Sequence, residues 1–343
     1  MSSADRLTPP QGNPAEMFLR HPGNPIITAA DLPSVVNAVF NPGATVFEGE
    51  TLLLLRVEER TGLSHLVVGR SPNGYSNWTV ERDRGMFAQT STFEEHWGIE
   101  DPRITQVGNE YLIVYTGYST TGALVLLAST RDFVHFDRRG VLQPPEDKDA
   151  ALFPTRFGGR WALIHRPTPQ MPGVGTHIWL SWSPDLRHFG DAKVLLAARH
   201  GAWWDANKVG LGPPPMLTHA GWLVCYHGVH TTPSGAIYRL GLALLDRDDP
   251  TRVVARSNEW VFGPSTHYER TGDVADVVFP CGWILDDDGD TIRMYYGAAD
   301  SVVCLATASL KAMLDHVMTH PCAEGDSSHL PAPPTAPTIG DSS

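Results

Sequence analysis

The segment PRITQVGNEYLIVYTG, residues 102–117, contains a proline, a short apolar run, a polar turn and a second apolar run. This order predicts a β-hairpin, because two apolar runs that flank a short turn containing Gly or Asn are typical of paired antiparallel strands. The same order recurs in PGATVFEGETLLLLRV (42–57), PTRFGGRWALIHRP (154–167), PMLTHAGWLVCYHG (215–228) and PCGWILDDDGDTIRMYYG (280–297). The leading prolines are 60, 52, 61 and 65 residues apart. One hairpin in each repeat of this length predicts an all-β fold, a five-bladed β-propeller.

The repeats define one large domain. They span residues 38–312, after an N-terminal extension at 1–37 and before a C-terminal segment at 313–343. Residues 310–318 are expected to form a short helix, and the Pro- and Ser-rich tail beyond Pro321 is expected to be disordered. A large β-sandwich could also contain this many strands, but it gives no reason for a polar position that repeats with each hairpin.

Composition and charge exclude several classes of function. The 343 residues carry a formal net charge of −12, which argues against nucleic-acid binding because a phosphate backbone requires clustered Lys and Arg. No apolar run is long enough to span a membrane, and the polar N-terminus shows no secretory signal. Cys225, Cys281 and Cys304 lie in apolar strand contexts that are typical of buried free thiols, so we expect a cytoplasmic protein.

Polar residues occur at one end of the repeat. In a hairpin, the residues before the first strand and those that end the second strand lie together. A propeller turns this end of each unit toward its axis, so the sequence predicts a central active-site pocket. The positions concerned are Asn41, Asp101, Asp149 and Lys208 before first strands, and Arg56, Tyr115, His165, Arg166, His227 and Tyr296 at second-strand ends.

Asp101 is the candidate catalytic residue. It belongs to GIEDPR (98–103), at the entry to a predicted innermost strand. A single carboxylate whose pKa is raised by partial burial is suited to general acid catalysis, although Glu-Asp-Pro is also common in purely structural turns. Glu100 is expected to point elsewhere, because neighbours on an extended strand alternate faces. Arg103 is expected either to orient Asp101 or to pair with another acid.

Four cationic or ionisable side chains share the same end of the repeat: Arg56, Arg166, Lys208 and His227. Converging positive charge is unfavourable unless an anion neutralises it, which phosphate or a carboxylate would do. The alternative is that each residue pairs with a nearby acid such as Asp149, Asp205 or Asp276. We favour an anion site, because the four residues come from equivalent positions in different repeats.

Aromatic residues flank the same loops and are suited to stacking on sugar rings: Trp203, Trp204, Tyr226, Tyr268, Tyr295 and Tyr296. The sequence contains no Gly-rich dinucleotide motif, no P-loop and no CxxC pair, so no redox or nucleotide cofactor is expected. The histidines are dispersed and lack metal-ligand spacing, so no metal is expected either.

Long stretches of the chain resemble the mannoside phosphorylases of glycoside hydrolase family 130. They cover nearly all of residues 37–310 in the family's order and include FNPGAT (40–45), GIEDPR (98–103), KDAALFP (148–154), HRP (165–167), KVGLGPPP (208–215) and YYGAAD (295–300). The resemblance implies a five-bladed propeller in which inorganic phosphate, a co-substrate, replaces water. Phosphate would attack the anomeric carbon of a non-reducing-end β-mannosyl unit, giving α-mannose 1-phosphate and a shortened acceptor sugar.

The resemblance also implies a role for individual residues. Asp101 matches the general acid, which in the family is thought to protonate the glycosidic oxygen through the mannosyl 3-hydroxyl. The phosphate-side positions are Arg56, Arg166, Lys208 and His227, and the sugar-side positions are Asn41, Asp149 and Asp300. Tyr296 is expected to contact the sugar because of its place at a second-strand end, independently of the resemblance. An inverting hydrolase would need a second carboxylate about 6.5–9.5 Å away to activate water, whereas phosphate is already a nucleophile.

Two departures from the family pattern leave alternatives open. Gly212 to Pro215 is richer in proline than the usual form, and Asp276 follows Ala275 where Pro-Asn is expected. Asp276 would be the base of an inverting β-mannosidase, but such hydrolases tend to lose the lysine and histidine that are retained here as Lys208 and His227. A non-catalytic carbohydrate-binding propeller is the other alternative. The expected partners are therefore a small-molecule mannoside or manno-oligosaccharide and inorganic phosphate, with no nucleic acid or membrane, and a homo-oligomer is possible.

Overall fold

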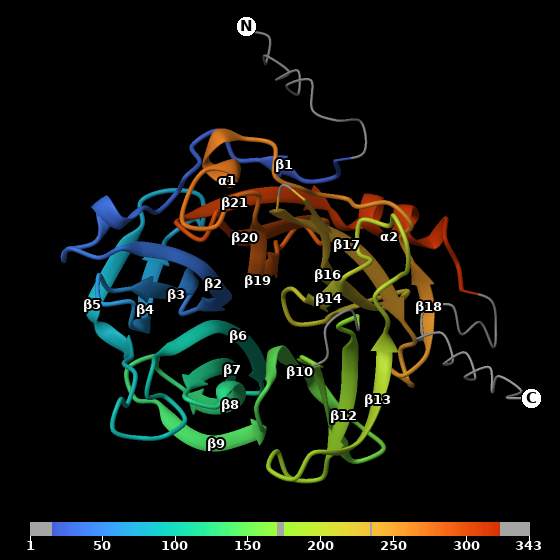
Figure 1. Ribbon diagram of the computed structural model, residues 1–343, viewed down its shortest axis with the longest axis horizontal. Coiled ribbons are helices and arrows are strands. Elements are labelled where there is room, and N and C mark those ends of the chain that lie inside the picture. Colours follow the sequence, from blue (N-terminus) through green and yellow to red (C-terminus); the bar gives the residue numbers. More distant parts are fainter. Residues whose placement is uncertain (1–15, 170–174, 234, 323–343) are drawn as a thin grey trace, which may run out of the picture.

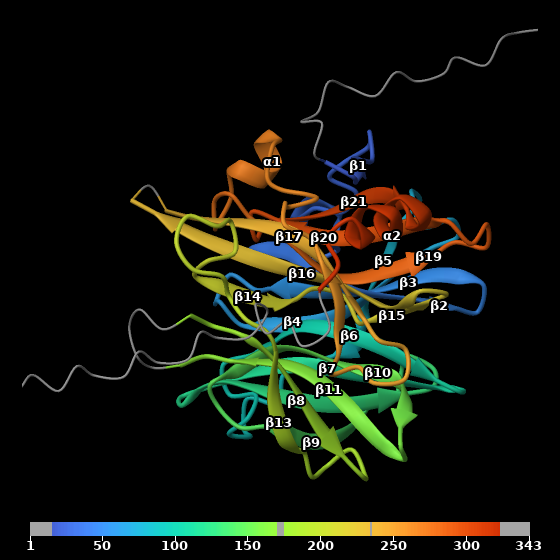
Figure 2. The same ribbon diagram turned by 90° about the vertical axis from the view of Figure 1, so that its right-hand side faces the viewer.

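Five antiparallel sheets make up nearly all of the regular structure. The computed structural model describes residues 16–169, 175–233 and 235–322. Figure 1 shows the sheets around a common axis, with β2, β6, β10, β14 and β19 innermost, and Figure 2 shows the same ring turned by 90°. The predicted five-bladed propeller is thus confirmed, whereas the predicted disordered tail beyond residue 322 lies outside the described residues.

Each blade contains four or five strands. The first blade contains β2 (Ala38–Phe47), β3 (Glu50–Glu58), β4 (Ser64–Ser71) and β5 (Thr79–Met86). The second contains β6 (Ile99–Val107), β7 (Glu110–Ser119), β8 (Gly122–Thr130) and β9 (Asp137–Gln143). The third contains β10 (Asp147–Phe157), β11 (Arg160–Pro167), β12 (Ile178–Ser183) and β13 (Gly190–Leu196). The fourth contains β14 (Lys208–Leu211), β15 (Met216–Thr218), β16 (Gly221–Thr232), β17 (Gly235–Leu245) and β18 (Val253–Arg256). The fifth contains β19 (Val278–Leu285), β20 (Thr291–Ala298), β21 (Val302–Ser309) and β1 (Leu19–Arg20).

The four consecutive leucines of β3 illustrate how the blades share a core. Leu52 and Leu54 pack against the second blade, in a cluster with Ile113. Leu53 and Leu55 pack on the opposite face, in a cluster with residues of the fifth blade. Alternate side chains of a strand point to opposite faces of its sheet, and both faces of a blade are covered by its neighbours. An unbroken apolar run is therefore the expected pattern for an inner strand, and all four leucines are fully buried.

The N-terminal segment completes the fifth blade. In β1, Leu19 and Arg20 pair with Thr307 and Ala306 of β21, and both views place these strands side by side. Part of the predicted extension at 1–37 is thus the outermost strand of the last blade. A strand of two residues has no readable periodicity, so the pattern of apolar residues could not reveal it.

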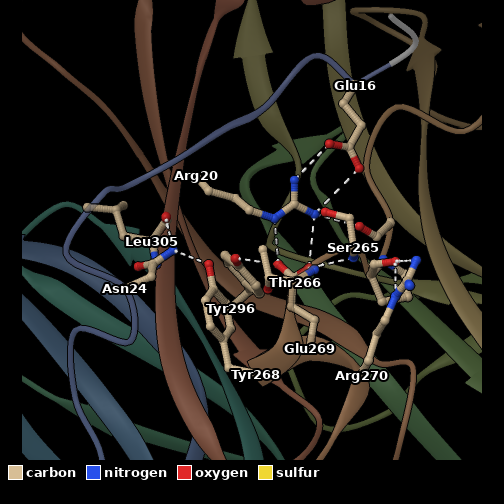
Figure 3. A network of polar contacts seen from close by, with 12 residues as sticks. Glu16, Arg20, Asn24, Ser265, Thr266, Tyr268, Glu269, Arg270, Tyr296 and Leu305 are labelled. Atoms are coloured by element: carbon tan, nitrogen blue, oxygen red, sulfur yellow. Dashed lines mark hydrogen bonds and ion pairs between the residues drawn. The ribbon is translucent and has the colours of Figure 1, made fainter. Parts of the chain in front are cut away.

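A buried ion pair attaches this segment to the blade (Figure 3). Arg20 donates from Nε and Nη2 to the two carboxylate oxygens of Glu269, at 2.8 and 3.0 Å. Glu269, in α1 (His267–Arg270), is fully buried and also accepts hydrogen bonds from the Tyr296 hydroxyl and the Ser265 and Thr266 amides. Each oxygen of the buried carboxylate therefore has partners, which is the condition for burying such a charge without a large penalty.

Two further short elements lie outside the sheets, η1 (Ala29–Asp31) and α2 (Leu310–Met318). The bounds of α2 match the predicted terminal helix. Its N-cap, Ser309, accepts a hydrogen bond from the Ala312 amide, and its apolar side packs on the core between the fourth and fifth blades. In the part of the chain that the structure describes, no helix has both the length and the apolar character to cross a membrane.

Candidate active site

Three inner strands carry a β-bulge at the same position of the repeat. The register shifts between Phe40 and Gly43 in β2, and correspondingly in β6 and β10. Asn41, Asp101 and Asp149 lie in these bulges with φ values of 44°, 51° and 52°. Asn and Asp adopt positive φ more readily than other side chains, and a bulge redirects the side chain that it carries. The bulges therefore direct equivalent polar residues from three blades to one place.

Asp101 lies at the centre of the first group of contacts. Its Oδ1 accepts hydrogen bonds from Asn41 Nδ2 at 2.9 Å and from Arg56 Nη1 at 3.1 Å. Arg56 also lies over the Phe40 ring, with its guanidinium carbon 4.4 Å from the centroid. Asn41 and Asp101 are both almost completely buried. These contacts fix the orientation of the carboxylate, as a group that transfers a proton requires.

Glu100 belongs to the same group, which contradicts the prediction that it points elsewhere. Its Oε1 accepts a hydrogen bond from Arg56 Nη2 at 2.9 Å, and its Oε2 lies 3.8 Å from Lys148 Nζ. The prediction assumed the strict alternation of an extended strand. The bulge and the positive φ at Asp101 interrupt that alternation, so consecutive side chains reach the same cluster.

The electrostatics of Asp101 also differ from the prediction of a raised pKa. Burial opposes ionisation, but Arg56, Lys148 and Arg103 outweigh it, and the Asp101 pKa is lowered from its usual value. The carboxyl group whose pKa is raised belongs to Asp300, on the fifth blade. Burial and the nearby Asp101 charge raise the pKa of Asp300 to about 6. The two neighbouring acids thus differ in protonation tendency, with Asp101 ionised more readily than Asp300.

A second group of contacts surrounds Asp149. Its Oδ2 accepts a hydrogen bond from Arg166 Nε at 2.6 Å and lies 3.5 Å from His227 Nε2. Its Oδ1 lies 3.7 Å from Arg103 Nη2 but has no hydrogen-bond partner among the described residues. Asp149 therefore lies among the residues predicted for the phosphate side, although the resemblance implied a sugar-side position.

His227 and Lys208 occupy the fourth-blade side of this group. Burial and the nearby cations lower the pKa of His227 to about 3, although Asp149 opposes this shift, so the ring is neutral at neutral pH. Its Nδ1 is buried and has no partner within the described part of the chain. Lys208 Nζ donates to the Tyr238 hydroxyl at 3.2 Å. His227 thus offers an uncharged hydrogen-bonding group, and Lys208 a cation held by a neutral partner.

Glycines permit the close approach of these side chains. A Cβ on Gly297 would lie 2.0 Å from Asn41 Oδ1, and one on Gly210 would lie 2.4 Å from the His227 ring. Both distances are far below van der Waals contact. Any side chain at either position would displace a residue of the cluster.

Two cluster residues were not assigned to the site from the sequence. Lys148 received no role, and Arg103 was expected either to orient Asp101 or to pair with another acid. Lys148 lies beside Glu100, and its charge acts on Asp101, Asp149 and Asp300. The signal for Lys148 was its place in the repeat, one residue before Asp149, as Glu100 precedes Asp101. Arg103 donates to the backbone oxygens of Asp101, Leu211 and Gly212, so it supports the loop of Asp101 rather than pairing with a surface acid.

Several predicted residues lie elsewhere. Tyr296 is fully buried in the core between blades, where its hydroxyl donates to Glu269, so a sugar contact does not fit its position. Side chains of β20 alternate between the two faces of the blade, so the Tyr296 ring turns into the core shared with the fourth blade. Tyr115 donates to Glu95, and His165 contacts Asp147 and Ser181, within separate buried networks.

Asp276 is half-buried at φ 60°, in the segment that precedes β19. Its backbone oxygen accepts from the Tyr238 amide, and its charge acts on Arg239. Tyr238, whose amide makes this contact, also accepts a hydrogen bond from Lys208 at its hydroxyl. The alternative pairing of cations with acids holds only in part. Arg56 pairs with Glu100 and Asp101, and Arg166 pairs with Asp149, whereas Lys208 donates to the Tyr238 hydroxyl. Asp205 pairs instead with Arg199 and Arg256.

The cluster combines two chemical capacities. One group presents an oriented carboxylate, and the other presents cations and a neutral imidazole that could hold an anion. Within residues 16–169, 175–233 and 235–322, no group of three or more His, Cys, Asp or Glu side chains could hold a metal. The fold and this cluster define a five-bladed propeller in which an oriented carboxylate lies beside a group of cationic side chains.

Comparisons with known proteins identify the family. Residues 21–319 match the family model described as beta-1,4-mannooligosaccharide phosphorylase, in glycoside hydrolase family 130, and the chain belongs to this family. It is 33% identical to a beta-1,2-mannobiose phosphorylase of Listeria innocua, over 82% of this chain and 93% of that protein. It is 30% identical to a beta-1,4-mannooligosaccharide phosphorylase of Ruminococcus albus, over 91% of this chain and 95% of that protein. The solved complex of the Listeria innocua enzyme with beta-1,2-mannobiose superposes with a TM-score of 0.79 at 29% identity, over 88% of this chain and 99% of that one.

Proposed function

We propose that the protein is an inverting phosphorylase that transfers a non-reducing-end β-mannosyl unit to inorganic phosphate. The products are α-mannose 1-phosphate and a shortened acceptor sugar. The observation that carries this proposal is the adjacency of the Asp101 group to the cations of the second group. Family membership supports the substrate class, because the named relatives are phosphorylases of β-mannosides.

Asp101 is assigned the role of general acid. Asn41 and Arg56 orient its carboxylate, and Arg103 donates a hydrogen bond to its backbone oxygen. In the free enzyme its lowered pKa favours the ionised form. A bound phosphate would offset part of the neighbouring positive charge and so raise the Asp101 pKa, which makes protonation dependent on the presence of the nucleophile. Asn41 and Asp300 are assigned to the mannosyl unit.

Phosphate is assigned to Arg166, Lys208 and His227, with Arg56 and Lys148 between the two groups. The neutral state of His227 suits this role, because an imidazole can donate a hydrogen bond to phosphate without adding another charge to a crowded cationic site. Lys208 can exchange its neutral Tyr238 contact for the anion. The reaction as proposed needs phosphate as co-substrate and no metal or organic cofactor. Buried free thiols at Cys225, Cys281 and Cys304 support a reducing, cytoplasmic location.

The decisive experiment incubates the enzyme with β-1,4- and β-1,2-mannobiose, with and without phosphate, and measures mannose 1-phosphate and free mannose. Mannose 1-phosphate that forms only with phosphate supports the proposal. Free mannose released at the same rate without phosphate would contradict it and would indicate a β-mannosidase. In that case Asp276→Asn should abolish activity, whereas a phosphorylase should tolerate the change. Binding without any product would indicate a carbohydrate-binding propeller.

A further inference from the structure

An open groove of about 620 Å³ lies outside the axial cluster, and none of the residues assigned to the reaction lines it. Its volume falls within the usual range of small-molecule sites, about 300–1,000 Å³. The residues that line it come from the loop before β14 and from the segment after β18: His200, Ala202, Trp203, Trp204, Asn258, Glu259 and Trp260.

Strand directions place this groove at the same end of the propeller as the cluster. β14 begins at Lys208, which pairs with Val229 near the end of β16. β18 runs antiparallel to β17, so it runs toward the side where β14 begins. The segment after β18 continues in that direction, because the Val261 amide donates to the Leu240 backbone oxygen and Leu240 pairs with His227. The loop before β14 and the segment after β18 thus meet on the face where the cluster lies. A long ligand that enters the axial site could extend across this face.

Three tryptophans form the groove. The Trp203 side chain is 42% exposed, although it belongs to a residue type that is usually well buried. The Arg199 guanidinium carbon lies 4.6 Å from the Trp203 ring centroid, and Arg239 lies 5.2 Å from that of Trp260. Trp204 is buried beneath them and donates from Nε1 to the Asn258 backbone oxygen at 2.8 Å.

A buried polar network holds this surface in place. Arg199 donates to Asp205 Oδ2 at 3.1 Å and to the Ser257 backbone oxygen at 3.0 Å. Asp205 is fully buried and also accepts from Arg256 at 2.8 Å and from the Tyr226 hydroxyl at 3.1 Å. The two halves of the groove are therefore tied together. A surface that is already ordered loses little entropy when it binds a ligand.

The chemistry of the groove fits a saccharide. A pyranose ring has an apolar C–H face, which can stack on an indole, and hydroxyl groups at its edge, which require hydrogen-bonding partners. His200, Asn258 and Glu259 supply such partners beside the tryptophans. The lining carries both an acid and a base and no cluster of like charge, so it is poorly suited to a phosphate backbone.

We propose that this groove is an accessory saccharide-binding site, which holds mannosyl units of a long β-manno-oligosaccharide outside the site of cleavage. The identity of the sugar rests on the function proposed above, whereas the saccharide class rests on the groove itself. Trp203 supplies the stacking surface, and the neighbouring polar side chains supply hydrogen bonds to the hydroxyl groups. The site would thus favour long substrates over disaccharides.

The test uses Trp203→Leu, which keeps an apolar side chain but removes the flat ring, and Trp203→Tyr, which keeps a flat ring. Phosphorolysis of mannobiose and of mannohexaose is measured for both linkage series. Trp203→Leu should raise KM for the favoured mannohexaose at least about fivefold, a loss of about 1 kcal/mol, with kcat unchanged. For the same variant, kcat and KM for mannobiose should stay within about twofold of the wild-type values. Trp203→Tyr should resemble the wild type on both substrates.

Calorimetry separates failure of this proposal from failure of the proposed function. Mannohexaose is titrated into Asp101→Asn with and without Trp203→Leu, and the affinity should fall at least about fivefold in the double variant. This comparison holds even if the wild type phosphorolyses no mannoside. Unchanged affinity and unchanged KM would overturn the proposal. A dimer in light scattering that Trp203→Leu dissociates would also overturn it, because the groove would then be a subunit interface.

Discussion

At the residue scale, the site depends on three side chains held at positive φ. Asn41, Asp101 and Asp149 repeat one local device, a bulge that turns a short polar side chain toward the axis. Asn and Asp are among the few residues that accept this backbone conformation at low cost. Their identity is therefore constrained twice, by the backbone and by the chemistry of the cluster.

Asp101→Asn should lower kcat for phosphorolysis by about 10²–10⁴-fold, because an amide of the same shape cannot donate the proton of a carboxylic acid. The fold should be retained, since Arg56 keeps its contact with Glu100. Steady-state kinetics and thermal unfolding measure the two effects. Activity within tenfold of the wild type would show that another group supplies the proton.

Asp300 should make stability depend on pH. Its pKa is raised to about 6 from the ordinary 3.8, so between these values the folded protein binds more protons than the unfolded chain. The free energy of unfolding contributed by this group therefore falls as pH rises from about 4 to about 6. Asp300→Asn removes that fall, so the variant should gain stability relative to the wild type between pH 4 and pH 7. Urea titrations at both pH values test this, and parallel changes in the two proteins would contradict it.

The position of the site was predictable from the sequence, whereas its electrostatics were not. Repeat register located Asn41, Asp101 and Asp149, because hairpin ends must meet at the axis. The protonation states depend on distances between blades. Lys148 lowers the pKa of Asp101, and Asp101 raises that of Asp300, across separate sheets. No spacing along the chain encodes those distances. Tyr296 was placed wrongly in the pocket for another reason, because the prediction did not apply the alternation of side chains along its strand.

At the scale of elements, β1 shows the limit of pattern reading. The hairpins and α2 followed from apolar runs, but a two-residue strand is defined only by its partner, β21. Its stability depends on side chains rather than on strand length. Arg20 in β1 and Glu269 in α1 form the ion pair that joins the N-terminal segment to the fifth blade.

Arg20→Met should destabilise the protein by about 3–5 kcal/mol, because it leaves the fully buried Glu269 carboxylate without its cation. Chemical denaturation measures the loss. Lys311→Met is the matched control, since it breaks an exposed helical pair with Asp315 whose contribution solvent screening keeps small. Equal effects of the two substitutions would contradict the assigned role of Arg20.

At the scale of the whole molecule, the axial cluster concentrates cations inside a protein whose net charge is −12. Each cation comes from a different strand, and the carboxylates of Glu100, Asp101 and Asp149 offset only part of their charge. An anion that binds at the axis should therefore stabilise the entire propeller rather than one loop.

Phosphate at about 100 times its dissociation constant should stabilise the folded state by about 2.7 kcal/mol, with a corresponding rise in Tm. Lys208→Met should reduce this stabilisation. Lys193→Met is the control, because Lys193 lies exposed on the outer strand β13 and its loss changes the net charge equally. Thermal unfolding with phosphate or with chloride at the same ionic strength measures the effect. Equal phosphate responses in the two variants would contradict the assignment of Lys208.

The pairing of β1 with β21 also constrains when the enzyme can become active during its synthesis. The first four blades use contiguous stretches of chain, so each can form soon after it leaves the ribosome. The fifth blade needs one strand that is made before the other four blades and three that are made after them. Asn41 and Asp300 flank the junction that this blade closes. Catalytic competence should therefore appear in a single late step, after β21 has left the ribosomal exit tunnel, with no partly active nascent chain before it.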